Sequence, residues 1–247
     1  MATIIAANWK MYKVRGEAYE TAKALRQALQ KGTKQRDVFL FPPFTAVQVV
    51  AEALQGVPNL FMGAQNFYPV EEGAFTGEVS LKMIKDCGAD WVLVGHSERR
   101  HILNESEAFI AQKTKYAIEH GFGVMLCIGE TLAEREAGKL EAVLGSQLKT
   151  ALTDCPHPAG KLIIAYEPVW AIGTGKVATT AEVDEAHGKV KELLGGIDKE
   201  LANLPVLYGG SVKPANAAQL LALDNVDGLL VGGASLDAES FYSIITA

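Results

Sequence analysis

The sequence predicts an α/β fold in which eight parallel strands close into a (β/α)8 barrel ringed by helices. Eight short apolar runs alternate with longer stretches of helical period. The chain has 247 residues, a size typical of such a barrel. No linker, low-complexity tract or break in composition divides it, so we expect one domain over residues 1–247. A doubly wound open sheet is the rival, but it would need fewer strands or a second domain.

The strands are expected where short runs are apolar throughout, as in strands buried on both faces. They cover residues 4–8, 38–41, 60–64, 91–94, 124–128, 162–166, 206–208 and 229–231.

The helices between them are expected from apolar residues that share one helical face, followed by a glycine that ends the helix. Such stripes are Ala18, Ala22, Leu25 and Leu29 before Gly32; Phe44, Val47, Val50 and Leu54 before Gly56; Leu81 and Ile84 before Gly88; and Ile110, Ala117 and Ile118 before Gly121. Thr131 with Glu134, and Thr179 with Glu182, match capping boxes, and Pro214 suits a first helical turn. Val183, Ala186, Val190 and Leu194 form a further stripe, and Phe241, Ile244 and Ile245 close the chain.

Composition excludes several classes of function. The formal charge of −6 leaves no global basic surface for nucleic acid, so a bound anion must be held by local groups. The three cysteines form no CxxC pair, which argues against a disulfide framework or a zinc cluster. No apolar run could span a bilayer, and the N-terminus lacks a basic leader. A cytoplasmic protein is therefore expected.

In such a barrel, sites form where strands end and the following loops begin. Asn8-Trp9-Lys10 follows the first strand, where Lys10 is either a solvated charge or a cation held near an anionic substrate. His96 follows the fourth strand, and a helix beginning at Ser97 would lower the pKa of its imidazole. A histidine satisfied in the core is the structural alternative. Cys127 is expected to be a small packing residue.

Glu167 follows the sixth strand and is expected to be a general base on rigid backbone, because Pro168 favours an extended conformation in the residue before it. The segment after it is uncharged up to Lys176 and contains two glycines, which favours a movable lid that grips an anion. An ordinary strand-to-helix loop is the alternative. The lid residues are Pro168, Val169, Trp170, Ala171, Ile172, Gly173, Thr174, Gly175 and Lys176.

Two glycine pairs follow the last two strands, Gly209-Gly210 before Ser211 and Gly232-Gly233. Bared backbone N–H groups in these loops often bind phosphate, although tight turns would use the same residues. A dinucleotide fingerprint is excluded by spacing, because Gly173 does not follow its strand directly. The long loop over residues 65–78 is expected to bind something, with a solvent-exposed loop as the alternative.

Six motifs in this order resemble the triosephosphate isomerase family, whose fold is the TIM barrel, and the resemblance runs essentially end to end. They are Asn8-Trp9-Lys10-Met11, residues 94–100 around His96, Cys127-Ile128-Gly129-Glu130-Thr131, residues 165–176, Tyr208-Gly209-Gly210-Ser211-Val212 and Val231-Gly232-Gly233-Ala234-Ser235.

The resemblance implies interconversion of dihydroxyacetone phosphate and D-glyceraldehyde 3-phosphate through an enediolate, a step of glycolysis and gluconeogenesis. It implies catalysis by Glu167, His96 and Lys10, with no metal and no organic cofactor. It also implies substrate binding by Asn8 and Lys10 and a phosphate grip by Gly173, Ser211, Gly232 and Gly233.

By the same resemblance the chain forms a homodimer or a higher assembly. The loop over residues 65–78 would enter a second subunit through Thr76, Gly77 and Glu78. Two residues depart from the family pattern, Tyr12 and Lys191, and Lys191 is expected to face Asp227. There are two alternatives. One is another phosphate-binding barrel enzyme, such as an aldolase, and the other is a catalytically silent sugar-phosphate sensor. The joint presence of Lys10, His96 and Glu167 argues against a sensor.

Overall fold

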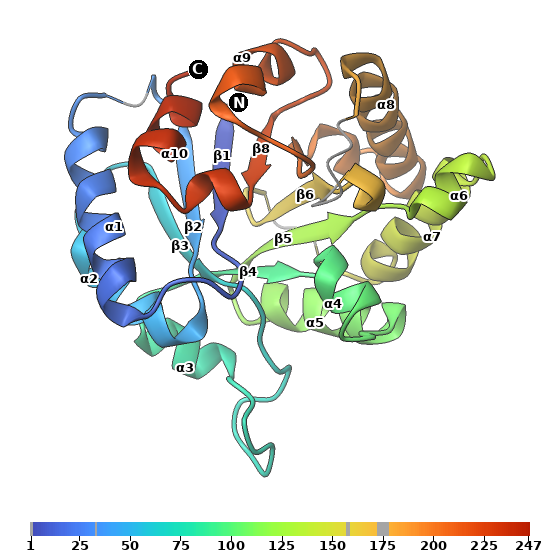
Figure 1. Ribbon diagram of the computed structural model, residues 1–247. Helices are drawn as coiled ribbons and strands as arrows, with labels where there is room; N and C mark the ends of the chain where they lie inside the picture. The colour runs from blue at the N-terminus through green and yellow to red at the C-terminus, as the bar shows by residue number, and fades with distance from the viewer. Residues whose placement is uncertain (1, 33, 157–158, 172–177) are drawn as a thin grey trace.

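The computed structural model contains a closed barrel of eight parallel strands in chain order, which confirms the predicted fold class (Figure 1). The structure describes residues 2–32, 34–156, 159–171 and 178–247. The strands are β1 (Ile4–Asn8), β2 (Asp37–Phe41), β3 (Leu60–Ala64), β4 (Trp91–Val94), β5 (Gly123–Ile128), β6 (Leu162–Tyr166), β7 (Val206–Tyr208) and β8 (Gly228–Val231).

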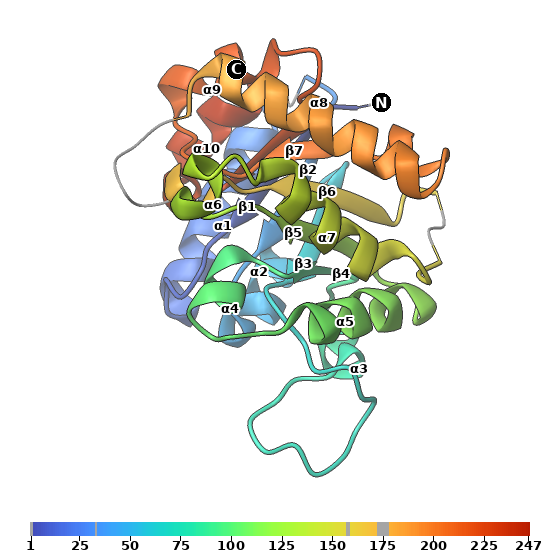
Figure 2. The same ribbon diagram turned by 90° about the vertical axis from the view of Figure 1, so that its right-hand side faces the viewer.

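Helices surround this barrel on its outside (Figures 1 and 2). The α-helices are α1 (Arg15–Leu29), α2 (Val47–Leu54), α3 (Leu81–Asp86), α4 (Ser97–His101), α5 (Glu107–Glu119), α6 (Leu132–Glu136), α7 (Leu140–Leu152), α8 (Thr180–Ile197), α9 (Pro214–Leu221) and α10 (Ala238–Ile245). Short 3-10 helices are η1 (Phe44–Ala46), η2 (Val169–Ala171), η3 (Leu201–Asn203) and η4 (Gly233–Ser235). Among the described residues, no helix is long and apolar enough to cross a membrane.

Five strands have the predicted bounds, and three begin one residue earlier, at Asp37, Gly123 and Gly228. Each of these residues is paired by a neighbouring strand or loop: the Asp37 amide donates to the Thr3 carbonyl, for example, over 3.1 Å. Charged residues and glycine have low strand propensity, so pairing across the barrel, and not local preference, extends these strands.

Successive residues of each strand point alternately into the barrel and toward the helices. On β5, Met125 and Cys127 belong to the cluster inside the barrel, whereas Val124 and Leu126 pack against the helices. Cys127 is fully buried, and burial raises the pKa of its thiol, so it remains a protonated packing residue as predicted.

The predicted helical stripes form the outer core, with one exception. The buried residues of α1 are the four predicted, and both capping boxes are present, with the Thr131 and Thr179 side chains accepting from the amides of Glu134 and Glu182. The prediction for Phe44 was wrong, because this residue lies in η1 and is exposed. A 3-10 turn rotates each residue by more than an α-helix does, so Phe44 leaves the stripe that begins at Val47.

One histidine with no predicted role lies fully buried on α8. The His187 ring packs edge-on against Tyr166, with centroids 5.7 Å apart, and its Nδ1 lies 3.2 Å from the carbonyl oxygen of Asn225. Burial lowers the pKa of His187 to about 4. The folded protein therefore keeps this imidazole neutral at pH values where an unfolded chain would protonate it.

Acid is accordingly expected to destabilise the protein through His187. Between its unfolded pKa of 6.5 and its folded pKa of about 4, the unfolded state binds more protons, so the free energy of unfolding falls as the pH falls. The contribution is about 3 kcal/mol at about 1.4 kcal/mol per pH unit. Denaturant unfolding at pH 7 and pH 4 measures it, and His187→Gln should show a smaller loss over this range. An equal loss in both proteins would contradict the assignment.

The connection between β3 and α3 projects away from the barrel as a long arm (Figures 1 and 2). Its ends are joined by a hydrogen bond of 2.9 Å, which the Tyr68 amide donates to the Val79 carbonyl. Within the arm, the ring centroids of Tyr68 and Phe75 lie 4.5 Å apart. The arm is thus internally packed, yet Phe75 remains exposed.

Candidate active site

A cavity of about 460 Å³ opens at the carboxyl ends of the strands. Its walls bring together residues that follow five different strands, β1, β4, β6, β7 and β8. The lining residues are Asn8, Lys10, His96, Glu167, Gly209, Gly210, Ser211, Val212, Lys213, Leu230, Gly232, Gly233 and Ala234. All the predicted catalytic side chains therefore face one cavity, together with the predicted substrate-binding residues other than Gly173, which lies outside the described residues.

Glu167 stands at the end of β6 on backbone that continues the barrel pairing, since its amide donates to the Ile128 carbonyl over 2.7 Å. Its carboxylate is buried and accepts from the Ser97 amide at 2.9 Å, while Oε1 lies 3.0 Å from His96 Nε2. Burial by itself raises the pKa of Glu167, but His96, the Ser97 amide and Lys10 outweigh it and hold that pKa below its usual value. The side chain is therefore an ionised carboxylate at neutral pH, as a general base requires.

Two glycines let neighbouring backbone lie against Glu167. A Cβ atom on Gly129 would overlap the Glu167 carbonyl oxygen, and one on Gly209 would come within 2.9 Å of the Glu167 Cγ. Gly129 is fixed in turn by Gln147 of α7, which accepts from its amide at 2.9 Å and donates to its carbonyl at 3.1 Å. The base is thus held by contacts on both neighbouring loops.

His96 caps the N-terminus of α4, as the predicted helix at Ser97 requires, and its Nδ1 accepts from the Glu98 amide at 3.3 Å. In the neutral imidazole this leaves the proton on Nε2, which points at Glu167. The expected lowering of the His96 pKa was wrong for this arrangement. Burial does lower that pKa, but the Glu167 carboxylate raises it, and the net pKa is raised.

Lys10 adopts a left-handed backbone conformation, with φ of 52°. The Asn8 side chain holds this turn by accepting from the Lys10 amide at 2.9 Å, and Gln65 donates to the Lys10 carbonyl at 2.9 Å. Such strained backbone persists only where its surroundings enforce it, and it is common at functional sites. The ammonium group lies 2.8 Å from Glu98. Asn8 therefore lines the cavity and also fixes the position of Lys10.

The part of the cavity wall formed by Gly232 and Gly233 consists of backbone, because glycine has no side chain. Gly232 precedes η4, whose first N–H groups have no partner within the helix. The indole of Trp9 donates to the Ser235 carbonyl at 3.1 Å and ties η4 to the end of β1. Ser211 lies beside these glycines in the same cavity. Bared N–H groups beside Lys10 suit an anion.

The described part of the predicted lid runs from Pro168 to Ala171 and includes η2. Trp170 Nε1 donates to Glu130 Oε1 at 2.9 Å, and the Val169 amide donates to the Glu130 carbonyl at 3.1 Å. The remaining lid residues, Ile172, Gly173, Thr174, Gly175 and Lys176, lie outside the described residues.

Glu130 does not line the cavity, but its carboxylate contacts residues on both sides of Glu167, and the sequence assigned it no role. It follows β5 as directly as the predicted residues follow their strands, so its position was the available signal. Its carboxylate is fully buried and also accepts from the Tyr166 hydroxyl at 3.0 Å. Lys191 lies 3.0 Å from Asp227, as expected, whereas Tyr12 is exposed.

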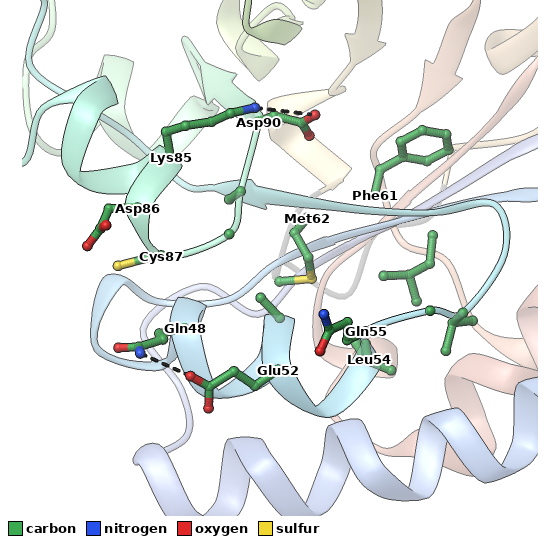
Figure 3. Close-up of a pocket in the computed structure, with 16 residues that line it drawn as sticks. Gln48, Glu52, Leu54, Gln55, Phe61, Met62, Lys85, Asp86, Cys87 and Asp90 are labelled. Atoms are coloured by element: carbon green, nitrogen blue, oxygen red, sulfur yellow. Dashed lines mark hydrogen bonds and ion pairs between the residues drawn. The ribbon is translucent and has the colours of Figure 1, made fainter.

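A second hollow, of about 530 Å³, lies between α2 and α3 (Figure 3). Its polar contacts are Gln48 with Glu52 at 3.0 Å and Lys85 with Asp90 at 3.9 Å. None of the predicted site residues lines it. Convergent polar groups with shifted pKa values mark the other cavity, so the active site is assigned there. Within the described ranges, no cluster of three or more His, Cys, Asp or Glu residues could hold a metal ion.

Comparison with known proteins gives the same family along the whole chain. The triosephosphate isomerase family model matches residues 3–247. Triosephosphate isomerases from Lawsonia intracellularis and Oleidesulfovibrio alaskensis are each 54% identical to this chain, covering 100% of it and 98% and 100% of those proteins. That of Fusobacterium nucleatum is 47% identical over 99% of this chain and 98% of its own length. With this likeness and a barrel whose strand ends gather the family's motif residues, the chain belongs to the triosephosphate isomerase family.

Proposed function

We propose that this protein interconverts dihydroxyacetone phosphate and D-glyceraldehyde 3-phosphate, a step of glycolysis and gluconeogenesis, as one domain over residues 1–247. The observation that carries the proposal is the convergence of Lys10, His96 and Glu167 on one cavity. The reaction moves a proton between adjacent carbons, so it needs a base, donors for the developing oxyanion and a site for the phosphate. The cavity offers groups suited to each need.

Glu167 is the base. In this structure the Glu167 carboxylate contacts His96 Nε2 and accepts a hydrogen bond from the Ser97 amide. The side chain must change its conformation to reach a carbon of the substrate. Burial keeps competing water away, and a carboxylate held close to a carbon acid contributes about 10²–10⁴-fold to the rate.

His96 and Lys10 are the electrophiles. The Nε2–H of His96 would donate to the carbonyl oxygen once Glu167 has turned away, and the Lys10 ammonium would stabilise the same developing charge. The turn held by Asn8 fixes the backbone of Lys10 at the wall of the cavity, so only its ammonium group, now paired with Glu98, has to reorient.

The substrate's phosphate does not react, and its binding energy is free to orient the carbons. Ser211, Gly232 and Gly233 would hold it by backbone N–H groups, with Gly173 and the lid residues closing over it. Neither metal nor organic cofactor enters any step of this mechanism.

The direct test adds either triose phosphate to the purified protein and follows the other by proton NMR. Isomerisation in both directions that converges on one equilibrium ratio supports the proposal. Binding without turnover would indicate a sugar-phosphate sensor, and cleavage or condensation would indicate an aldolase.

A homodimer in the cytoplasm is the proposed working form. The arm projects beyond the barrel (Figure 2), and Thr76, Gly77 and Glu78 in it are exposed. Phe75 in the arm and Met11 beside Lys10 also expose large apolar side chains. A partner's arm, led by Thr76, would cover the loop that carries Asn8 and Lys10.

Shortening the arm by replacing residues 70–77 with a short glycine-serine turn is expected to give a monomer with much reduced activity, since Lys10 would lose this support. Light scattering measures the mass, and the isomerisation assay measures the activity. A wild-type protein that is a fully active monomer in dilute solution would contradict the proposal.

A further inference from the structure

The carboxylate of Glu130 joins the two segments that flank Glu167. Its Oε1 accepts from the Tyr166 hydroxyl, one residue before the base, and from the Trp170 indole, three residues after it. The Val169 amide donates to its main-chain carbonyl. Glu130 therefore contacts residues on both sides of the base, through its carboxylate and through its main-chain carbonyl.

Such a carboxylate is costly to bury unless a cation lies near it. Glu130 is fully buried, and burial raises its pKa, which the Trp170 and Tyr166 donors and the charge of Arg135 offset in part. Arg135 is the cation beside it, with Nη1 3.9 Å from Glu130 Oε1. Among the described residues, Glu130 Oε2 and Arg135 Nη1 are buried without a hydrogen-bond partner.

Arg135 also reaches the segment after the base directly. Its guanidinium lies over the Trp170 ring, 6.0 Å from the centroid, and its other amino group lies 3.2 Å from Glu185 of α8. The α6 capping box at Thr131 and Glu134 holds the short helix from which Arg135 projects. The guanidinium therefore lies between a surface carboxylate and the buried Glu130, against the ring of Trp170.

We propose that Arg135 is a positioning residue for the general base: its charge lies beside the buried Glu130 carboxylate and its guanidinium braces Trp170, so that Glu130 can hold Tyr166 and Trp170 on either side of Glu167. This inference rests on the proposed isomerase function. Arg135 does not line the active-site cavity, so it acts only through these two neighbours.

Arg135→Met removes the charge and keeps most of the length. We expect kcat to fall about tenfold with KM changed less than about twofold, because small displacements of catalytic groups act on the chemical step. The acid limb of the pH profile, meaning the fall of kcat at low pH, should move to higher pH, because Glu130 without its cation takes up a proton more readily. The other groups around this pair are Tyr166 on β6 and Glu182 and Glu185 on α8.

Two matched variants separate this role from a general structural one. Arg135→Lys keeps the charge but loses the planar surface, so its acid limb should match the wild type while kcat recovers only in part. Glu185→Gln removes the exposed carboxylate at the outer end of the same contacts and should leave kcat and the pH profile unchanged. A wild-type kcat and acid limb in Arg135→Met, or an equal shift in Arg135→Lys, would overturn the proposal.

A double-mutant cycle with Glu130→Gln tests the route. If Arg135 acts partly through the charge of Glu130, Arg135→Met should no longer shift the acid limb in the Glu130→Gln background, and it should lower kcat there by less than the tenfold expected in the wild-type background, because only the contact with Trp170 remains to be lost. A tenfold loss of kcat and an equal shift of the acid limb on adding Arg135→Met in both backgrounds would overturn the route through Glu130.

Tryptophan fluorescence without substrate separates this inference from the assignment of function. The signal of Trp170 is obtained by subtracting the fluorescence of a Trp170→Phe protein. The pH midpoint of this signal should be higher in Arg135→Met than in the wild type, and an unchanged midpoint would overturn the inference. If the wild-type protein does not isomerise triose phosphates, the proposed function is wrong. The fluorescence measurement would still test whether Arg135 interacts with Glu130 and Trp170, because it needs no substrate.

Discussion

Replacing Glu167 by glutamine is expected to lower kcat by on the order of 10³–10⁴-fold, near the upper end of what a positioned base contributes. Glutamine has the shape of glutamate and can still accept from the Ser97 amide, so the cavity should keep its form. It cannot take a proton from carbon at neutral pH. The loss should therefore lie in turnover and not in binding.

The measurement pairs steady-state kinetics with calorimetric affinity for an unreactive three-carbon phosphate. Affinity should stay within a few-fold of wild type, because the substitution leaves unchanged Ser211, Gly232 and Gly233, the residues proposed to hold the phosphate. Turnover close to that of the wild type in Glu167→Gln would remove the base assignment.

Replacing Gly129 by alanine is expected to lower kcat about 100-fold, although residue 129 does not line the cavity. The added methyl group would overlap the Glu167 carbonyl oxygen, which is backbone and cannot rotate away as a side chain could. Gln147 holds Gly129 on its other side, so the collision should displace Glu167 from its place between His96 and Ser97.

Gly196→Ala is the matched control, because a Cβ atom there meets nothing within 4 Å and the substitution should leave kcat unchanged. Circular dichroism establishes that both proteins fold. A folded Gly129→Ala protein with wild-type kcat would show that the backbone contact does not position the base.

Much of the fold could be read from local patterns. Buried parallel strands are apolar throughout, and a helix against a barrel needs one apolar stripe, so β1 and α1 were predictable without long-range information. The start of β5 at Gly123 could not be predicted in this way, because Gly123 belongs to the strand only through its pairing with Trp91. Phe44 was misplaced because the sequence does not distinguish a 3-10 turn from the first turn of a helix.

The candidate site divides in the same way. Lys10, His96 and Glu167 were predictable because each lies within two residues of the end of a strand, and parallel strands of a barrel end on one face. The interactions among them were not. The net pKa of His96 depends on a carboxylate 71 positions away in the chain, and the helix end beside it predicted the opposite direction.

By itself the amino-acid sequence determined the barrel, the family and the residue types at the strand ends, since these follow from periodicity and order along the chain. Tertiary structure alone decided which groups touch: Gly129 beneath the backbone of Glu167, Glu130 between Tyr166 and Trp170, and Arg135 beside Glu130. The physical reason is that hydrogen bonds and charge interactions act over a few ångströms in space, whereas a sequence records only separation along the chain.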